Sequence, residues 1–231
     1  MREKPIVTID GPSGAGKTTV SIRLARRTSL TRLDTGAMYR ACALAARRAG
    51  IPWSDGERLG RLCADLPIGF RQEGEGMRIT LAGEDVGEAI RTPEISMGAS
   101  EVSTHAPVRE AMVSLQRRMG EGGGFVLEGR DTGTVVFPDA EAKFFLDAHA
   151  AVRALRRYRE WGTKERKTYE EVLRDVLRRD IQDSTRAHSP LRVAEGAVYI
   201  DSTTLSVDEV VETMLRSLPR FGRPAGGGGR A

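Results

Sequence analysis

The stretch Gly11-Pro-Ser-Gly-Ala-Gly-Lys-Thr18 decides the fold of this 231-residue chain. An alternating apolar run over residues 6–9 precedes it, and residues 19–27 follow it with helical periodicity. This strand–loop–helix setting matches the G-x-x-x-x-G-K-[ST] phosphate-binding loop. The sequence therefore predicts a site for a nucleoside triphosphate, and it leaves open which molecule receives the phosphate.

The chemistry of phosphate binding explains the spacing within this loop. Glycines at positions 11, 14 and 16 let the backbone curl, so that successive N–H groups converge on phosphate oxygens. The following helix adds unpaired N–H groups and the positive end of its dipole. Lys17 is placed to reach the β- and γ-phosphates, and the Thr18 hydroxyl to ligate Mg²⁺, the expected cofactor. The predicted ATP-binding residues are Gly11, Pro12, Ser13, Gly14, Ala15, Gly16, Lys17, Thr18 and Thr19.

Composition indicates a single cytoplasmic domain. A chain of 231 residues can bury a substantial core. Its polar first four residues and short apolar runs match neither a signal peptide nor a membrane span. The two cysteines, Cys42 and Cys63, fall in segments with helical patterns, which favours reduced buried thiols over a disulfide or a metal site. We therefore expect a cytoplasmic protein that does not contact a membrane.

The basic residues indicate phosphate recognition. The net charge of +4 is modest, and arginine dominates the basic residues. Aromatic residues make up only 5% of the chain, and the arginines are scattered among acidic residues instead of clustering with stacking rings. This distribution favours recognition of individual phosphates by guanidinium groups over nucleic-acid binding. Because no large apolar stripe remains once the predicted helices are packed, we expect a monomer.

Strand and helix patterns alternate along most of the chain, which predicts an α/β fold with a parallel sheet covered on both faces. The expected strands are residues 6–9, 32–34, 125–128, 143–146 and 197–200. Three expected helix starts carry a capping box, in which Ser or Thr is followed by Glu three residues later. These pairs are Ser54 with Glu57, Thr168 with Glu171, and Ser206 with Glu209.

Two regions depart from this alternation. Residues 68–86 alternate apolar and polar side chains around the segment 73–76, which predicts a small antiparallel hairpin inserted between helices. Residues 148–183 are rich in arginine and are interrupted near Gly162. This pattern fits either a charged surface helix–loop–helix or a mobile lid. The glycine-rich tail of residues 221–231 is expected to be disordered.

Two sequence clusters beyond the phosphate loop suggest binding residues. Asp34-Thr35-Gly36-Ala37-Met38-Tyr39-Arg40 opens a predicted helix, and Arg40 projects from its second turn. Gly129-Arg130-Asp131-Thr132-Gly133 follows an apolar strand, at the sheet edge where open α/β folds bind ligands. The alternative for the first cluster is that Asp34 only caps the helix and Arg40 is a solvated surface charge.

A third cluster contains Arg179, Asp183 and Arg186, which are spaced four and three residues apart. These residues share one face of a helix if the helix continues that far. The alternative to a binding role is a salt bridge within the helix.

Taken together, these motifs closely resemble those of bacterial cytidylate kinases. The matching stretches are residues 9–17, 34–40, 129–131 with 133–138, the Arg179-Asp-x-x-Asp183-x-x-Arg186 pattern, and residues 201–206. The resemblance covers about residues 4–220. It implies an enzyme of pyrimidine nucleotide metabolism that transfers phosphate from ATP to CMP, giving ADP and CDP, with dCMP as a second acceptor.

The resemblance also implies an architecture. Residues 1–220 would form one three-layer α/β/α P-loop kinase domain around a parallel sheet. An insert over about residues 37–105, with a small antiparallel sheet, would bind the acceptor. A helical lid over about residues 148–186 would close over both substrates.

Each matching residue inherits an expected role from the resemblance. Acceptor phosphate binding is implied for Arg40, Arg130 and Arg186, and base recognition for Ser100, Arg109 and Asp131. Sugar contacts are implied for Arg179 and Asp183, and Thr35 completes the CMP-binding set. Lys17 and Arg130, together with the lid residues Arg153 and Arg157, would neutralise charge on the transferring group, and Arg156 is a further lid candidate.

Discrimination of the base has a physical rationale at Asp131. A carboxylate can accept a hydrogen bond from the 4-amino group of cytosine, whereas uracil presents an acceptor oxygen at that position and leaves both groups unpaired. No general base is needed, because a phosphate monoester has a second pKa of about 6 and is mostly ionised near neutrality. Within this chemistry, UMP is the nearest alternative acceptor.

Other classes of P-loop protein fit the sequence less well. A regulatory GTPase would carry an Asn-Lys-x-Asp motif, and this chain contains no Asn. A motor ATPase would usually show an apolar strand ending in Asp-Glu, whereas residues 125–128 lead into Glu-Gly-Arg-Asp. A nucleic-acid-binding module would need aromatic stacking platforms, and these are scarce here.

Overall fold

The computed structural model describes residues 2, 4–73, 76–162 and 167–218. Its centre is a five-stranded sheet in the order β2-β6-β1-β7-β8, and every neighbouring pair is parallel. The strands are β1 Ile6–Asp10, β2 Thr31–Asp34, β6 Phe125–Gly129, β7 Ala142–Asp147 and β8 Val198–Asp201. All five predicted strands are confirmed, with ends that differ by one residue at most.

The register of the sheet brings two sequence motifs to one edge. Ile9 pairs with Glu128 and Asp10 pairs with Gly129, so β1 and β6 end side by side. The phosphate loop leaves the carboxyl end of β1, and Arg130 and Asp131 leave the carboxyl end of β6. In a parallel sheet this edge is where ligands bind.

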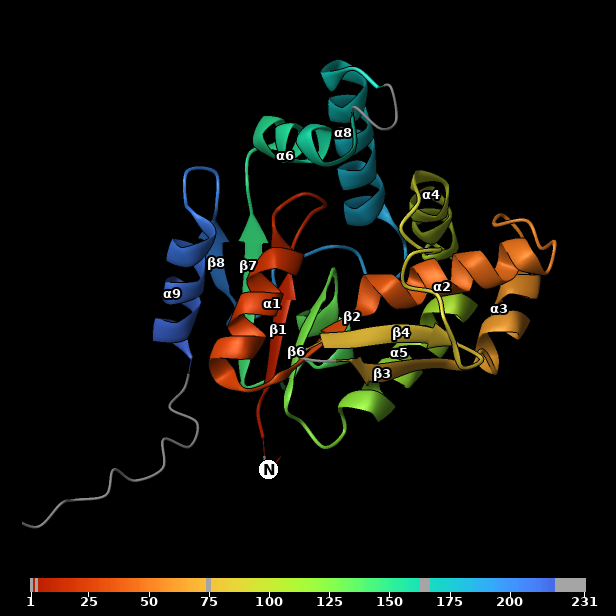
Figure 1. Ribbon diagram of the computed structural model, residues 1–231, viewed down its shortest axis with the longest axis horizontal. Helices are drawn as coiled ribbons and strands as arrows, with labels where there is room; N and C mark the ends of the chain where they lie inside the picture. The colour runs from red at the N-terminus through yellow and green to blue at the C-terminus, as the bar shows by residue number, and fades with distance from the viewer. Residues whose placement is uncertain (1, 3, 74–75, 163–166, 219–231) are drawn as a thin grey trace, which may run out of the picture.

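Helices cover both faces of the sheet and give three layers (Figure 1). On one face, helices α1 (Lys17–Thr28) and α9 (Val207–Ser217) pack on Val7, Ile9 and Phe144. On the other face, Ile6, Leu33 and Leu127 pack against α5 (Ala106–Gly120) and the π-helical turn η1 (Thr132–Val136). The predicted α/β/α core is confirmed, because β1 is buried along its whole length, as expected for a strand covered on both faces.

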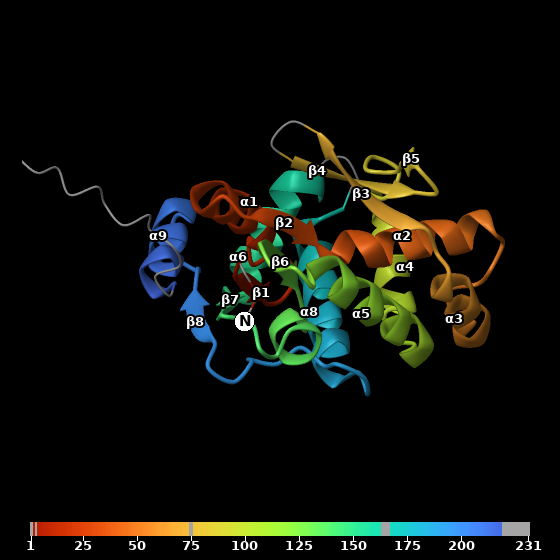
Figure 2. The same ribbon diagram turned by 90° about the horizontal axis from the view of Figure 1, so that it is seen from below.

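A second sheet lies beside the core and belongs to the insert between β2 and β6 (Figure 2). Strands β3 (Ile68–Glu73), β4 (Gly76–Leu81) and β5 (Glu84–Asp85) are antiparallel. Strands β3 and β4 share a hydrophobic core with helices α2 (Thr35–Arg48), α3 (Gly56–Ala64), α4 (Pro93–Val102) and α5. The predicted hairpin is confirmed; residues 74–75 of its turn lie outside the described residues.

Helix α6 (Ala150–Arg157) continues into the π-helical turn η2 (Tyr158–Gly162), and α8 (Tyr169–Thr185) follows. The two helices share a small core in which Ala154 packs against Val172 and Val176. The break predicted near Gly162 is therefore present, and residues 163–166 and the tail 221–231 lie outside the described residues. Among the helices that the structure describes, none is both long and apolar enough to cross a membrane.

Two of the three predicted capping boxes are confirmed. Thr168 and Ser206 each accept from the backbone N–H three residues later, and the Glu side chain at that position binds back. The prediction at Ser54 is wrong, because Asp55 caps α3 by accepting from the Arg58 backbone N–H. A carboxylate one residue later serves the same unpaired helical N–H groups.

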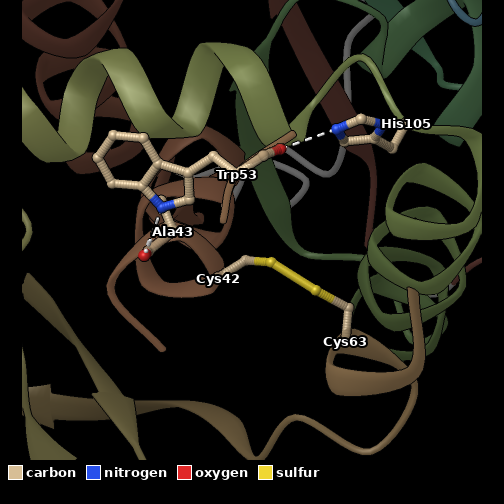
Figure 3. Close-up of a disulfide and its surroundings, with 5 residues drawn as sticks. All are labelled: Cys42, Ala43, Trp53, Cys63 and His105. Carbon is tan, nitrogen blue, oxygen red and sulfur yellow. Dashed lines mark hydrogen bonds between the residues drawn. A yellow bond between two sulfur atoms is a disulfide. The ribbon is translucent and has the colours of Figure 1, made fainter. Parts of the chain in front are cut away.

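The prediction of two reduced thiols is also wrong: Cys42 of α2 and Cys63 of α3 form a disulfide (Figure 3). Both sulfurs are buried, and the two Cα atoms lie 6.6 Å apart. Both segments are helical, as their patterns predict, but helical periodicity cannot show that α2 and α3 pack against each other. The nearby loop is held by Trp53, whose Nε1 donates to Ala43 O at 3.0 Å, and by His105 Nε2, which donates to Trp53 O at 2.8 Å.

Reduction of this disulfide is expected to lower the free energy of unfolding by about 3 kcal/mol, since the bond joins residues 21 apart in the sequence. Denaturant unfolding with and without reductant measures the change. The Cys63→Ala variant is the control, because its unfolding midpoint should not respond to reductant. An unchanged midpoint in fully reduced wild-type protein would contradict the prediction.

Candidate functional site

A cleft of about 850 Å³ lies over the carboxyl ends of β1, β2 and β6. The phosphate loop and α1 line one side, α2 and α4 line the opposite side, and α6 and α8 close the top. Figure 1 shows these three groups of elements meeting around the end of the sheet. Nearly all of the sequence-predicted residues line this one space; Gly11, Pro12, Ser100 and Arg153 are the exceptions.

The phosphate loop adopts backbone angles that favour glycine. Gly11, Gly14 and Gly16 have φ angles of 150°, 80° and 96°. At Gly11 a side chain is also excluded by space, because a Cβ atom would collide with the carbonyl oxygen of Leu146 on β7. The loop then enters α1 at Lys17, so the free N–H groups of the first helical turn face the cleft.

Lys17 is folded back onto its own loop. Its ammonium is buried and donates to the carbonyl oxygen of Pro12 at 2.7 Å. Burial, reinforced by the charge of Arg130, lowers the pKa of Lys17 well below its usual value. The charges of Glu128 and Asp183 offset this lowering only in part, and a phosphate at the loop would bring a further negative charge to the ammonium.

The residues present fit a magnesium ion that arrives with a nucleotide. Thr18 follows Lys17 on the first turn of α1, and its exposed side chain lines the cleft. Magnesium typically binds one or two protein ligands and completes its shell with phosphate oxygens and water. The described residues contain no group of three or more His, Cys, Asp or Glu that could hold an ion by themselves. The donor set therefore suits an ion that is shared with a phosphate.

The three arginines of α6 are not equivalent. Arg157 lines the cleft and its Nη1 donates to Ser13 Oγ at 3.0 Å. Arg156 also lines the cleft, where its Nη2 donates to Ser202 O at 2.7 Å. Arg153 is buried and does not line the cleft, because its Nη1 and Nη2 grip the two oxygens of Asp180 on α8 at 3.0 and 2.6 Å. Arg153 also donates to Ser13 O at 3.1 Å, so it joins α6 and α8 to the phosphate loop.

Asp183 organises three arginines at the centre of the cleft. It accepts a hydrogen bond from Arg130 Nε at 2.7 Å, and Arg179 and Arg186 each approach it to 3.9 Å. Burial by itself raises the pKa of Asp183, but Arg130, Arg179 and Arg186 together hold it below its usual value. Arg130 and Arg179 repel each other in turn, and burial together with this repulsion lowers the pKa of Arg179 to about 10. Three positive charges surround one negative charge here, and this excess of positive charge suits an anionic ligand.

A second buried pair lies deeper in the cleft. Asp131 accepts a short hydrogen bond from Arg109 Nη2, and its other oxygen lies 3.8 Å from Arg186 Nη2. The Arg109 guanidinium also lies over the ring of Tyr39, 5.4 Å from the ring centre. Ser100 is nearby on α4, and its Oγ is buried without a hydrogen-bond partner among the described residues. Asp131 therefore keeps one oxygen available to a ligand in a pocket of buried polar groups.

The opening of α2 supplies a third arginine site. Asp34 caps the helix by accepting from Ala37 N at 2.9 Å, and it also accepts from Arg40 Nη2 at 3.0 Å. The Asp34 carboxylate therefore both caps α2 and orients Arg40. Thr35 lines the cleft, but its hydroxyl already donates to Glu128 O at 2.7 Å.

Sequence reasoning missed two carboxylates that shape the site. Asp10, at the end of β1, accepts from Thr132 N at 2.9 Å and Gly133 N at 2.7 Å, which holds the loop that carries Asp131. Glu128, at the end of β6, lines the cleft and binds Arg32. Their position at the carboxyl ends of predicted parallel strands was the signal that could have identified them.

Sequence reasoning also missed the apolar end of the cleft beyond the phosphate loop. Leu205, Val207 and Val210 line it, with Arg156 and Ser202 beside them. Ser202 and Leu205 lie between β8 and α9, and Val207 and Val210 lie in the first turns of α9, so these four residues are far in the chain from the loop that they adjoin. No local pattern indicates this proximity.

Comparison with known proteins gives a consistent result. The family model described as cytidylate kinase matches residues 7–220. A cytidylate kinase from Geobacter sp. (strain M21) is 52% identical over 214 residues, which cover 92% of this chain and 92% of the relative. Cytidylate kinases from Syntrophotalea carbinolica and Geobacter sulfurreducens are also 52% identical, over 94% and 90% of this chain and 92% and 90% of their own lengths.

Proposed function

This chain belongs to the cytidylate kinase family, and from that premise we propose that it transfers the γ-phosphoryl group of ATP to CMP, giving ADP and CDP. The observation that supports this most directly is the cleft in which a phosphate loop faces a cluster of arginines. One side suits the phosphates of a donor and the other side suits the phosphate of an acceptor. dCMP is proposed as a second acceptor.

On the donor side, the backbone of the phosphate loop would hold the triphosphate, with Lys17 at the β- and γ-phosphates. The Thr18 hydroxyl would hold Mg²⁺, which neutralises charge on the phosphates when bound. The adenine would extend toward Leu205 and Val207, where the cleft wall is apolar and Arg156 lies alongside.

On the acceptor side, Arg40, Arg130 and Arg186 would bind the CMP phosphate, since their guanidinium groups can grip two oxygens at once. Arg179, Asp183 and Thr35 would contact the sugar. Asp131 would accept from the cytosine 4-amino group while Arg109 and Ser100 complete the base pocket. In this arrangement Asp183 has two tasks, because it also holds the three arginines around it.

Transfer would proceed by in-line attack of a phosphate oxygen, without a general base. The protein contributes position and charge, which are the main requirements of phosphoryl transfer. Lys17, Arg130 and Arg157 would neutralise the transferring group. For Arg153 we propose an indirect part, since its guanidinium is already engaged by Asp180 and the loop carbonyl of Ser13.

Residues 37–105 are proposed as the acceptor-binding insert and residues 148–186 as the lid of one kinase domain. We propose a cytoplasmic monomer that acts on small molecules and not on nucleic acid or membranes. A disulfide is uncommon in a reducing compartment. In this protein both sulfurs are buried, which limits the access of reductant to the bond.

The acceptor preference tests the proposal. An ADP-release assay with Mg·ATP is expected to show fast turnover with CMP and little with UMP or AMP. In Asp131→Ala, kcat/KM for CMP should fall by about 10²-fold or more, because the buried Arg109 loses its carboxylate partner together with the base contact. The exposed Asp139→Ala variant is the control. Preference for another nucleotide would contradict the proposed specificity for CMP. An absence of acceptor-dependent ADP release would contradict the proposed kinase activity.

A further inference from the structure

Arg32 on β2 makes contacts that no motif predicts. Its Nε donates to Ser21 Oγ on α1 at 3.0 Å. Its Nη2 donates to Asp34 Oδ2 at 3.2 Å and makes a short hydrogen bond to Glu128 Oε1. One guanidinium therefore joins the phosphate-loop helix, the end of β6 and the start of α2.

Two carboxylates at this place are unfavourable for a site that receives phosphates. Glu128 and Asp34 both line the cleft. Burial, followed by the charge of Asp34, raises the pKa of Glu128, and Arg32 is the first group that opposes this. For Asp34, burial raises the pKa, but Arg40 and Arg32 together lower it below its usual value. Arg32 is thus the cation common to both carboxylates.

The contacts continue from Arg32 to the acceptor site. Asp34 Oδ2 accepts from Arg32 on one side and from Arg40 Nη2, at 3.0 Å, on the other. Arg40 is one of the residues proposed to bind the CMP phosphate. Its orientation therefore depends on an oxygen that Arg32 also holds.

Arg32, Asp34 and Arg40 lie between two open spaces, so their side chains need hydrogen bonds to hold them in place. A second cavity of about 260 Å³ lies between this row of residues and the small sheet, and Arg32, Asp34 and Arg40 line it as well as the main cleft. The three side chains form a partition between two spaces, so packing alone does not fix them. Hydrogen bonds and charge must do so.

We propose that Arg32 is a positioning residue for acceptor binding: it neutralises Glu128 and Asp34 and thereby holds Arg40 toward the phosphate of CMP. Arg32 acts through these neighbours and not by touching the transferring group. This inference rests on the proposed function, because it assumes that CMP is the acceptor.

The test is calorimetric titration of the full chain with CMP and, separately, with ATP, for the wild-type protein, Arg32→Leu and Arg32→Lys. Arg27→Leu is the matched control, because Arg27 forms an exposed ion pair with Glu212 at 2.9 Å. In Arg32→Leu the Kd for CMP should rise at least about tenfold, as expected when a phosphate-binding group is displaced. The Kd for ATP should stay within about twofold, because the contacts of the phosphate loop remain.

Arg32→Lys keeps the positive charge but loses the planar guanidinium that reaches three partners. Its Kd for CMP should therefore lie between the values for the wild-type protein and for Arg32→Leu. Steady-state kinetics of the same variants should show KM for CMP rising while kcat at saturating CMP changes little. A change in KM without a change in kcat distinguishes a loss of acceptor positioning from a general loss of structure. A general loss of structure would lower the melting temperature and weaken the binding of both CMP and ATP.

Unchanged CMP binding in Arg32→Leu would overturn the inference. Equal weakening of CMP and ATP would also overturn it and would assign Arg32 a purely structural role. A wild-type protein that binds ATP but not CMP would instead overturn the proposed function, so the two failures are distinguishable.

Discussion

Lys17→Ala is expected to lose about 10²- to 10³-fold in kcat, the scale observed when one preorganised donor to a transition-state charge is removed. Lys17 belongs to the loop that would hold the triphosphate, and its ammonium donates to the Pro12 carbonyl oxygen. The ADP-release assay measures the loss at saturating ATP and CMP. Lys143→Ala is the control, since Lys143 donates to Glu195 O on the surface at 3.0 Å.

The fold should survive the change at Lys17. Burial disfavours the charged ammonium, so at neutral pH, below the usual pKa of lysine, Lys17 subtracts from stability. Its removal is expected to leave the melting temperature unchanged or slightly higher. Turnover near the wild-type rate would remove Lys17 from the proposed mechanism, and an unfolded variant would contradict this account of its burial.

Arg130→Ala is expected to lower kcat/KM for CMP by about 10²- to 10³-fold. Arg130 is proposed to contact the acceptor phosphate and the transferring group, and it also holds Asp183 at 2.7 Å. The measurement is steady-state kinetics with CMP varied at saturating ATP. Arg47→Ala is the matched control, because Arg47 forms an exposed ion pair with Glu94.

The Arg130 variant should fold with reduced acid stability. Arg179 and Arg186 remain 3.9 Å from Asp183, so the cost in unfolding free energy is expected to be about 1–3 kcal/mol. The pKa of folded Asp183 is depressed, so its stabilisation is present above the unfolded pKa and is lost as the pH falls through the folded pKa. Removing Arg130 raises that folded pKa, and the acid-unfolding midpoint should therefore move to higher pH. Wild-type kinetics in a folded variant would contradict the assignment.

Local sequence determined the elements of the site that depend on neighbouring residues. The phosphate loop needs left-handed glycines at set positions between a strand and a helix, and those residues are adjacent in the chain. Asp34 caps the helix that carries Arg40, and Asp183 is within one helical turn of Arg179 and Arg186. The parallel sheet follows from buried apolar runs separated by helices.

Tertiary structure alone decided which distant groups meet. Arg153 and Arg157 lie on the same helix in similar local sequence. Because α6 packs on α8, however, Arg153 binds Asp180, whereas Arg157 lines the cleft. The Cys42–Cys63 disulfide depends in the same way on the packing of α2 against α3.

The contacts of Arg32 depend most clearly on the tertiary structure. Ser21, Asp34 and Glu128 reach it from three elements, and Glu128 is 96 residues away in the chain. Hydrophobic periodicity, capping and glycine geometry act over a few residues, so the sequence determined the strands, helices and phosphate loop. The pairing of buried charges is settled by which element lies next to which, and for this protein only the folded chain decided it.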